Sequence, residues 1–165
     1  KQQNIDVRDN NRKVDIREYK KIVEILGPQN APISLAQFQE LKYNYSERYE
    51  RLRDVVYIQE KFKNGTWLDK INHEKQARHI QSTSPSGKSY FYDHVDINAL
   101  YDKYKMTGFL ETSRKGAQTS NEKVDLFEDR PLGIDVYTGK PVNAMTIKYS
   151  KTGAHLIPTY YERGD

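Results

Sequence analysis

Residues 149–158 read YSKTGAHLIP and place a histidine, a lysine and two hydroxyl side chains in one short stretch. A solvent-exposed hairpin tip needs none of these groups. Cleavage of a phosphodiester can use all of them, because an imidazole transfers protons while ammonium and hydroxyl groups stabilise the charge that develops on phosphorus. The stretch therefore supplies three candidate catalytic residues, His155, Ser150 and Thr152, and two candidate substrate-binding residues, Tyr149 and Lys151.

A second cluster lies upstream, where residues 71–80 read INHEKQARHI. On a helix, Lys75 and His79 are four residues apart and Arg78 is three residues from Lys75, so a cation and an imidazole share one face. Nearby positive charge disfavours the imidazolium, which predicts a lowered pKa for His79 and favours the neutral form that a general base needs. His79 and Lys75 are thus candidate catalytic residues, and Arg78 and Thr83 are candidate substrate-binding residues.

Together the two clusters meet the requirements of RNA cleavage without a metal. A base removes the proton of the 2′-hydroxyl, an acid protonates the leaving 5′-oxygen, and cations or hydrogen-bond donors stabilise the charged phosphorane. Two histidines with lysine, arginine and hydroxyl neighbours make a complete set. The hypothesis requires that the two clusters, far apart in the sequence, meet in the folded chain.

The sequence contains neither a metal-binding motif of the HExxH type nor a thiol group. His73 and Glu74 do not begin an HExxH motif, because Ala77 stands where the second histidine would be. The chain has no cysteine, which excludes disulfides and thiolate zinc sites. We therefore expect no metal and no cofactor. A DNase would need clustered carboxylates or histidines to hold a metal, while ADP-ribosyl transfer would need a nicotinamide pocket that sequence does not reveal.

The second part of the chain is close to neutral. The net charge is +4, yet residues 66–165 carry 14 basic and 13 acidic side chains. A protein that holds long nucleic acid mainly through phosphate contacts usually shows a concentrated basic stripe. Any contact with nucleic acid is therefore expected to be local.

The alternative to a catalytic site is a structural one. Residues 71–80 would then be an ordinary solvated helix, and His155 a half-buried packing residue. His73 and His94 are expected on the surface.

The hairpin that would present His155 can be drawn from the strand period. If Thr152 and Gly153 form a two-residue turn, Ser150 faces His155 across the hairpin. Side chains alternate between the faces of a strand. Ile147, Tyr149 and Leu156 then point to the core, while Lys148, Ser150 and His155 share the other face. A slip of one residue would exchange the two faces.

The first 65 residues are predicted to be a helical extension. Residues 1–13 are polar and aperiodic and are interpreted as a linker. Helix-spaced apolar residues follow from Val14 to Leu26, a second helix is expected after Ser34 as N-cap, and a third from about Ser46 to Phe62.

Residues 66–165 are predicted to form a small α+β domain with an antiparallel sheet. Helices are expected at 69–80 and 96–105, a loop at 111–123, and strands at 89–92, 124–127, 133–137, 144–149 and 154–159. No run of about 18 apolar residues is present, so no membrane contact is expected. Because the chain starts at Lys1 without a methionine, we interpret it as the C-terminal part of a longer protein.

The two clusters resemble one known family. The pattern Ile71-Asn72-x-x-Lys75-Gln76-x-x-His79-Ile80, the segment Tyr101-Asp102-Lys103-Tyr104, and Tyr149-Ser150-Lys151-x-Gly153-x-His155-x-x-Pro158 are similar to the bacterial toxin 50 family. These are polymorphic toxin domains grouped with the barnase, EndoU, colicin and RelE-like (BECR) ribonuclease folds. The resemblance covers residues 66–165 and implies a ribonuclease with an active site between the early helix and the sheet. Ser82 before Thr83, and Ala154, depart from the family pattern, which bears on loop geometry and substrate preference.

The upstream part resembles another context. Arg17-Glu18-Tyr19-Lys20, Ile25-Leu26-Gly27 and Phe38-Gln39-x-Leu41-Lys42-Tyr43 are similar to the region after the MuF-type head-morphogenesis domain of phage minor head proteins. This resemblance implies a virion-associated or delivered effector that acts in the target-cell cytoplasm, with an RNA substrate, a cognate immunity protein, and phage head or portal components as partners. The alternative is a non-enzymatic structural or interaction domain of a phage head protein.

Overall fold

The computed structural model describes residues 12–163 of the chain. The chain divides into two compact units, Lys1–Glu60 and Lys61–Asp165. The linker predicted for residues 1–13 falls mostly outside the described residues. Its last two positions, Arg12 and Lys13, instead begin the first helix, α2 (Arg12–Leu26).

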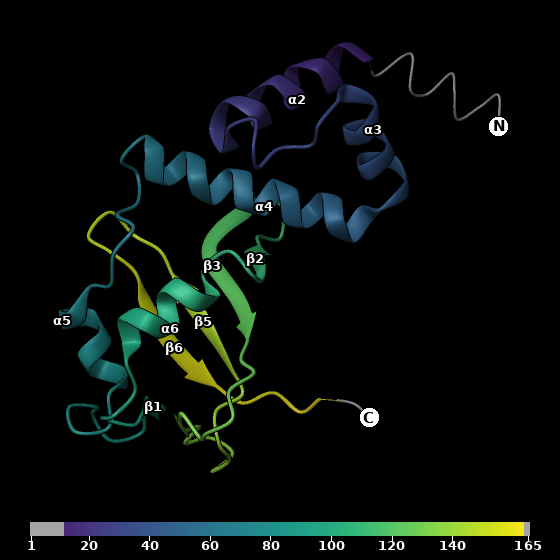
Figure 1. Cartoon of the computed structure of the whole chain (residues 1–165). Coiled ribbons are helices and arrows are strands. Elements are labelled where there is room, and N and C mark those ends of the chain that lie inside the picture. Colours follow the sequence, from purple (N-terminus) through teal and green to yellow (C-terminus); the bar gives the residue numbers. More distant parts are fainter. Residues whose placement is uncertain (1–11, 164–165) are drawn as a thin grey trace. The chain divides into compact units, whose positions relative to one another are not determined.

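The first unit is helical, as predicted. Helix α2 is followed by α3 (Leu35–Asn44) and α4 (Ser46–Lys63) (Figure 1). Ser34 caps α3, because its side chain accepts a hydrogen bond from the Gln37 backbone amide at 3.1 Å. Apolar residues from the three helices, Ile22, Phe38 and Val56, form the core of this unit. The helical spacing of apolar residues therefore predicted the three helices of this unit.

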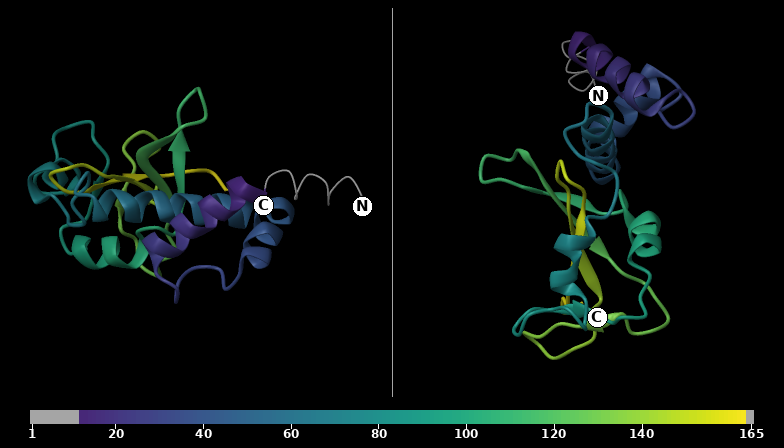
Figure 2. Two further views of the ribbon diagram at one scale, coloured as in Figure 1. Left: turned by 90° about the horizontal axis from the view of Figure 1, so that it is seen from above. Right: turned by 90° about the vertical axis from the view of Figure 1, so that its left-hand side faces the viewer.

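The second unit is built on a four-stranded antiparallel sheet. Its strands are β2 (Phe109–Thr112), β3 (Gln118–Asp125), β5 (Ala144–Lys148) and β6 (His155–Thr159), hydrogen-bonded in the order β2-β3-β5-β6. A two-stranded sheet pairs β1 (Tyr90–Phe91) with β4 (Gly133–Ile134). The helices of this unit are α5 (His73–Gln76), the 3₁₀ helix η1 (Ala77–His79) and α6 (Ile97–Tyr104). Figures 1 and 2 show α6 against one face of the sheet and α5 beside β6. The unit has the predicted α+β class.

The core of the second unit lies where β5 and β6 meet. Met145, Ile147 and Leu156 are fully buried. Leu100, Tyr101 and Tyr104 of α6 are also buried, and Asp96 caps that helix by accepting from the Ala99 amide. Strands β5 and β6 are therefore fixed by packing, and His155 sits at the first position of a rigid element.

Two elements differ from the sequence prediction. The helix expected at 69–80 begins only at His73, because the Asn72 side chain caps it there and the backbone of residues 70–72 pairs with the β5–β6 connection instead. The segment 111–123, predicted as a loop, forms most of the β2–β3 hairpin. Its residues are polar and largely solvent-exposed, so they carry no apolar alternation that would identify a strand.

The β5–β6 hairpin has a different register from the predicted one. Lys148, rather than Ser150, lies opposite His155, and Ile147 lies opposite Leu156. The connection is longer than two residues and spans 149–154. The shift equals two residues, so every side chain keeps its predicted face. Tyr149 is accordingly buried with Ile147 and Leu156, as the strand period predicted.

Within the described residues, no helix is both long enough and apolar enough to cross a bilayer.

Candidate active site

The two sequence clusters meet in the structure through backbone pairing. Leu68 N donates to Ser150 O at 3.0 Å, Ala154 N donates to Lys70 O at 2.7 Å, and Asn72 N donates to Ala154 O at 2.8 Å. These bonds hold the segment before α5 parallel to the β5–β6 connection. The requirement that the clusters come together is met.

Gln76 fastens α5 to β6. Its side-chain nitrogen donates to Leu156 O at 2.9 Å, and its side-chain oxygen accepts from Leu156 N at 2.6 Å. The side chain is almost completely buried. Because an amide that bonds a backbone in both directions leaves no polar group unsatisfied, this pair fixes the spacing between the helix and the strand that carry the two histidines.

Gly153 lets the connection approach the segment before α5. Its φ is +117°, and a Cβ atom there would lie 2.7 Å from the Lys70 carbonyl oxygen. Only glycine combines this backbone conformation with such a close approach. The glycine therefore allows the two hydroxyl residues that precede it, Ser150 and Thr152, to lie beside Lys75.

His79 and His155 face each other across this junction. Their ring centroids are 6.3 Å apart and the rings are nearly parallel, at 10°. His79 ends η1, whereas His155 begins β6. Two imidazoles at this separation can act on opposite sides of one reacting group.

The hydrogen bond of the His79 ring shows which of its two nitrogens carries the proton. Its Nδ1 lies 2.9 Å from the Ser89 carbonyl oxygen, which can only accept, so Nδ1 carries a hydrogen. Burial lowers the pKa of His79, the Ser89 carbonyl partly opposes this, and the charges of Lys88 and Arg78 lower it further. The neutral ring therefore has a free lone pair on Nε2, as a general base requires. The predicted direction of the pKa shift is confirmed, but burial is its main cause.

The pKa of His155 is lowered more strongly than that of His79. Burial, followed by His79 and the charges of Lys75, Lys148 and Arg78, lowers the pKa of His155 to about 4. Its Nδ1 is buried and has no hydrogen-bond partner among residues 12–163. A proton placed on Nδ1 would be an unsatisfied buried donor, which also disfavours the imidazolium. Both rings are thus neutral near pH 7 in the absence of a bound anion.

The predicted lysine and hydroxyl groups gather beside the histidines. Lys75 Nζ donates to Ser150 Oγ at 3.3 Å, and Ser150 Oγ lies 3.3 Å from Thr152 Oγ1. The Asn72 side chain donates to the Thr152 carbonyl at 3.1 Å and accepts from the Lys75 backbone amide at 3.1 Å. Asn72 therefore orients both halves of the cluster, a role that its N-cap position in the sequence could have indicated.

Four cations surround the imidazole pair. The positive charges of Lys75, Arg78 and Lys148 act on His155, and those of Lys88 and Arg78 act on His79. Within residues 12–163, no carboxylate forms an ion pair with any of the four. Unneutralised positive charge around two neutral imidazoles favours an anionic ligand. Lys88 and Lys148 were not among the predicted site residues, because their proximity depends on the fold.

Three predicted substrate-binding residues lie elsewhere or have other contacts. Tyr149 is 2% exposed, stacks on Trp67 at 4.9 Å and donates its hydroxyl to Glu122 at 2.6 Å, so it belongs to the core. Thr83 donates its hydroxyl to the Ala77 carbonyl at 2.6 Å, at the first residue of η1. Lys151 is exposed at the tip of the connection. Arg78, by contrast, is near both histidines.

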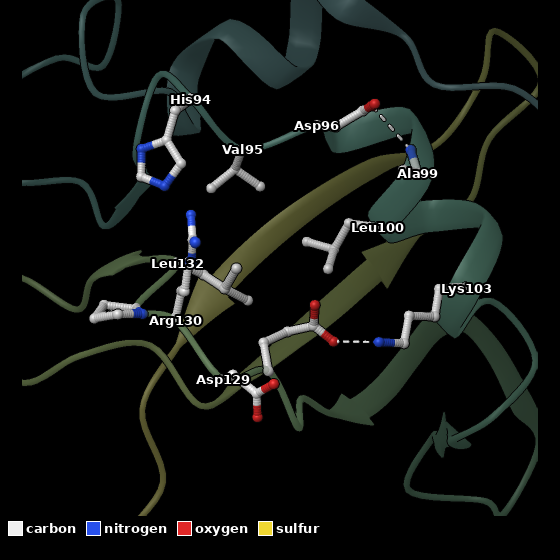
Figure 3. Close-up of a pocket in the computed structure, with 11 residues that line it drawn as sticks. His94, Val95, Asp96, Ala99, Leu100, Lys103, Asp129, Arg130 and Leu132 are labelled. Atoms are coloured by element: carbon white, nitrogen blue, oxygen red, sulfur yellow. Dashed lines mark hydrogen bonds and ion pairs between the residues drawn. The ribbon is translucent and has the colours of Figure 1, made fainter.

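A pocket of about 380 Å³ lies apart from these residues (Figure 3). It is formed between α6 and the segment 128–132, with an apolar floor that includes Val95, Leu100 and Leu132. Lys103 and Glu128 form an ion pair of 2.6 Å at its edge. It contains none of the predicted site residues, and a hollow alone does not define chemistry. The histidine pair, where titration is perturbed, is the candidate active site.

The residues at this site fit acid–base chemistry. Among the described residues, no group of three or more His, Asp or Glu side chains is arranged to hold a metal ion. The site instead combines a fixed proton acceptor, a second imidazole, an ammonium group and two hydroxyls. Such a set can deprotonate a hydroxyl nucleophile and protonate a leaving oxygen next to a phosphate.

Comparison with known families gives an independent result. Residues 71–158 match the family model of bacterial toxin 50, and this range is more than half of the chain. It includes α5, η1, β5 and all of β6 except Thr159, and therefore both histidines. A comparison with curated proteins found no match. On the extent of the family match, the chain belongs to the bacterial toxin 50 family.

Proposed function

We propose that this toxin domain is a metal-independent endoribonuclease in which His79 and His155 transfer the protons. The observation that supports it most is the facing pair of imidazoles, 6.3 Å apart, with lowered pKa values and four cations around them. Neutral imidazoles in a cationic setting suit a reaction in which an anion binds first and protons move afterwards.

The proposed reaction is an internal transesterification. The 2′-hydroxyl of the substrate loses its proton to Nε2 of His79, and the resulting oxygen attacks the adjacent phosphorus. The bond from phosphorus to the 5′-oxygen breaks, and that oxygen takes a proton from His155 in its imidazolium form, which the negative charge of the bound phosphate favours. The products are a 2′,3′-cyclic phosphate and a 5′-hydroxyl end. His155 gives up one proton and His79 gains one, so the pair must exchange protons with solvent before the next turnover.

The remaining residues act on charge. Lys75 Nζ, already hydrogen-bonded to Ser150, lies where an ammonium can neutralise a phosphate oxygen. The Thr152 hydroxyl adds a donor for the oxygens of the pentacovalent phosphorus, whereas Ser150, whose hydroxyl donates to the Gly153 carbonyl at 2.7 Å, accepts from Lys75 and holds it in place. Arg78 and the exposed Lys151 are proposed to contact flanking phosphates, as is Lys148.

The biological setting follows from the toxin family and from the resemblance of the helical unit to minor head proteins. We propose a virion-associated or otherwise delivered effector, neutralised in the producing cell by a cognate immunity protein. Phage head or portal components are the proposed partners of the upstream part.

The reaction is tested with purified protein, total bacterial RNA and a defined oligonucleotide, all in EDTA. The proposal expects discrete RNA fragments that carry 2′,3′-cyclic phosphates. An oligonucleotide of the same sequence with 2′-O-methyl groups should stay intact, because it lacks the nucleophile. Cleavage of the 2′-O-methyl or DNA version, or activity only with added metal, would contradict the proposed chemistry.

A further inference from the structure

A buried polar chain leads away from His79. The Ser89 carbonyl receives the His79 Nδ1 proton at 2.9 Å, and the hydroxyl of the same serine donates to Asp135 Oδ1 at 2.9 Å. Ser89 is 5% exposed and Asp135 is 3% exposed. A single residue thus connects the proposed base with a buried carboxylate. In the described part of the chain, neither Ser89 nor Asp135 forms a hydrogen bond with the cations around the site.

The fold holds this chain in place from the other side. Tyr90 pairs with Ile134, so the next position of the antiparallel ladder sets Ser89 opposite Asp135. Asp135 Oδ2 accepts from the Thr138 amide at 3.1 Å and from the Thr138 hydroxyl at 2.7 Å. The Val136 amide donates to Ser89 Oγ at 3.1 Å. The carboxylate is fully satisfied and cannot rotate without breaking the turn after β4.

The two oxygens of Asp135 serve different ends. Oδ2 closes the turn at residues 135–138, and this contact alone would satisfy a structural role. Oδ1 is directed at Ser89, whose carbonyl is the only hydrogen-bond acceptor of the His79 ring among residues 12–163. A freely rotating Ser89 peptide would release the Nδ1 proton and allow the other tautomer of the neutral ring.

We propose that Asp135 and Ser89 are positioning residues that hold His79 in its Nδ1–H tautomer, so that Nε2 stays available as the base. The proposal rests on the ribonuclease function proposed above. Asp135 gains no proton in it; its charge fixes the serine, and the serine carbonyl fixes the ring. Residues that orient a working imidazole in this way are worth roughly 10- to 100-fold in activity at metal sites, and a similar loss is expected here.

The direct test is the ¹⁵N NMR spectrum of the histidine side chains at neutral pH, assigned with a His79→Gln variant. The wild type should show protonated Nδ1 and unprotonated Nε2 at His79. Ser89→Ala and Asp135→Asn should both move His79 towards the Nε2–H tautomer. The matched controls are Ser86→Ala and Asp129→Asn, at exposed positions nearby, and these should leave the spectrum unchanged.

Kinetics supply the second readout. The two variants should lose about 10- to 100-fold in kcat with little change in KM, because phosphate binding by the cations is retained. Unchanged tautomer and unchanged kcat in folded variants would overturn the proposal, as would an Nε2–H tautomer in the wild type. The wild-type spectrum decides even if one variant fails to fold. The spectra need no substrate, so an inactive wild type would contradict the ribonuclease function without deciding the tautomer.

Discussion

Lys148 lies directly opposite His155 in the β5–β6 ladder, so both side chains are on the same face of the sheet, Lys148 exposed and His155 half-buried. This pairing puts a permanent positive charge next to an imidazole whose pKa is lowered to about 4. Burial is the largest cause of that shift, but Lys148 is one of the charges that add to it. The same lysine is well placed to receive a phosphate.

Lys148→Gln is therefore predicted to have two effects. The pKa of His155 should rise, by less than burial lowers it, because only one of several charges is removed. KM for RNA should rise roughly fivefold, equivalent to about 1 kcal/mol for one exposed phosphate contact. NMR titration of His155 and steady-state kinetics measure the two. Lys115→Gln, in the exposed β2–β3 turn, is the matched control, and equal effects of both variants would contradict a specific role.

The pH dependence of kcat/KM should be bell-shaped, with its maximum on the acid side of pH 6.5. Activity needs one histidine unprotonated and the other protonated, so the maximum lies between the two apparent pKa values of the pair. Both are lowered from 6.5, that of His155 to about 4. As pH rises above them the acid is lost, and as pH falls below them the base is lost. A maximum above pH 7 would be inconsistent with histidine as both acid and base.

Gln76→Ala should reduce both stability and activity. It leaves the amide and carbonyl of Leu156 unsatisfied in the core, which costs about 1–3 kcal/mol for each group. It also frees α5 from β6, so the spacing of His79 and His155 is no longer fixed. Urea denaturation and cleavage rates test this. Gln81→Ala, whose side chain is exposed, should change neither quantity.

Comparing Gly153→Ala with Gly87→Ala distinguishes the effect of a steric clash from the effect of backbone strain. At Gly153 an alanine meets both a positive φ and the Lys70 carbonyl, whereas at Gly87 it meets a positive φ of +87° with nothing within 4 Å. Gly87→Ala should cost about 1–2 kcal/mol of stability, with near-normal activity in the folded protein. Gly153→Ala should cost more stability and lower activity at least tenfold, because Ser150 and Thr152 are displaced. Equal activity of the two folded variants would show that the approach does not matter.

The sequence predicted those features that depend on local patterns, namely the spacing of apolar residues and the spacing of residues that can do chemistry. Helix-spaced apolar residues located α2, α4 and α6, and the alternation of Ile147, Tyr149 and Leu156 assigned the faces of the hairpin correctly. The spacing of Lys75 and His79, with His155 downstream, predicted two clusters that the fold does bring together. These signals are local, so they do not depend on how distant segments pair.

Other features depend on contacts between segments that are far apart in the sequence, and local patterns do not predict those contacts. The hairpin register follows from bonds between residues 68–72 and 150–154, which no turn rule contains. Strand β3 has no apolar alternation because all of its residues except Val124 are polar, including the buried Glu122. Ser89 and Asp135 carry no motif, since their relation to His79 arises only when β1 and β4 pair. Tyr149 was assigned both to the core and to substrate, and the structure gives it a core environment.

The most direct test of the account is the RNA-cleavage rate of four purified proteins: wild type, His79→Ala, His155→Ala and His73→Ala. His73 is exposed at the start of α5, six residues before His79, and controls for loss of an imidazole. The account predicts a loss of about 10²- to 10⁴-fold for each of the first two variants, with circular dichroism unchanged, and wild-type activity for His73→Ala. Cleavage that survives in folded His79→Ala and His155→Ala proteins would contradict histidine catalysis at this site.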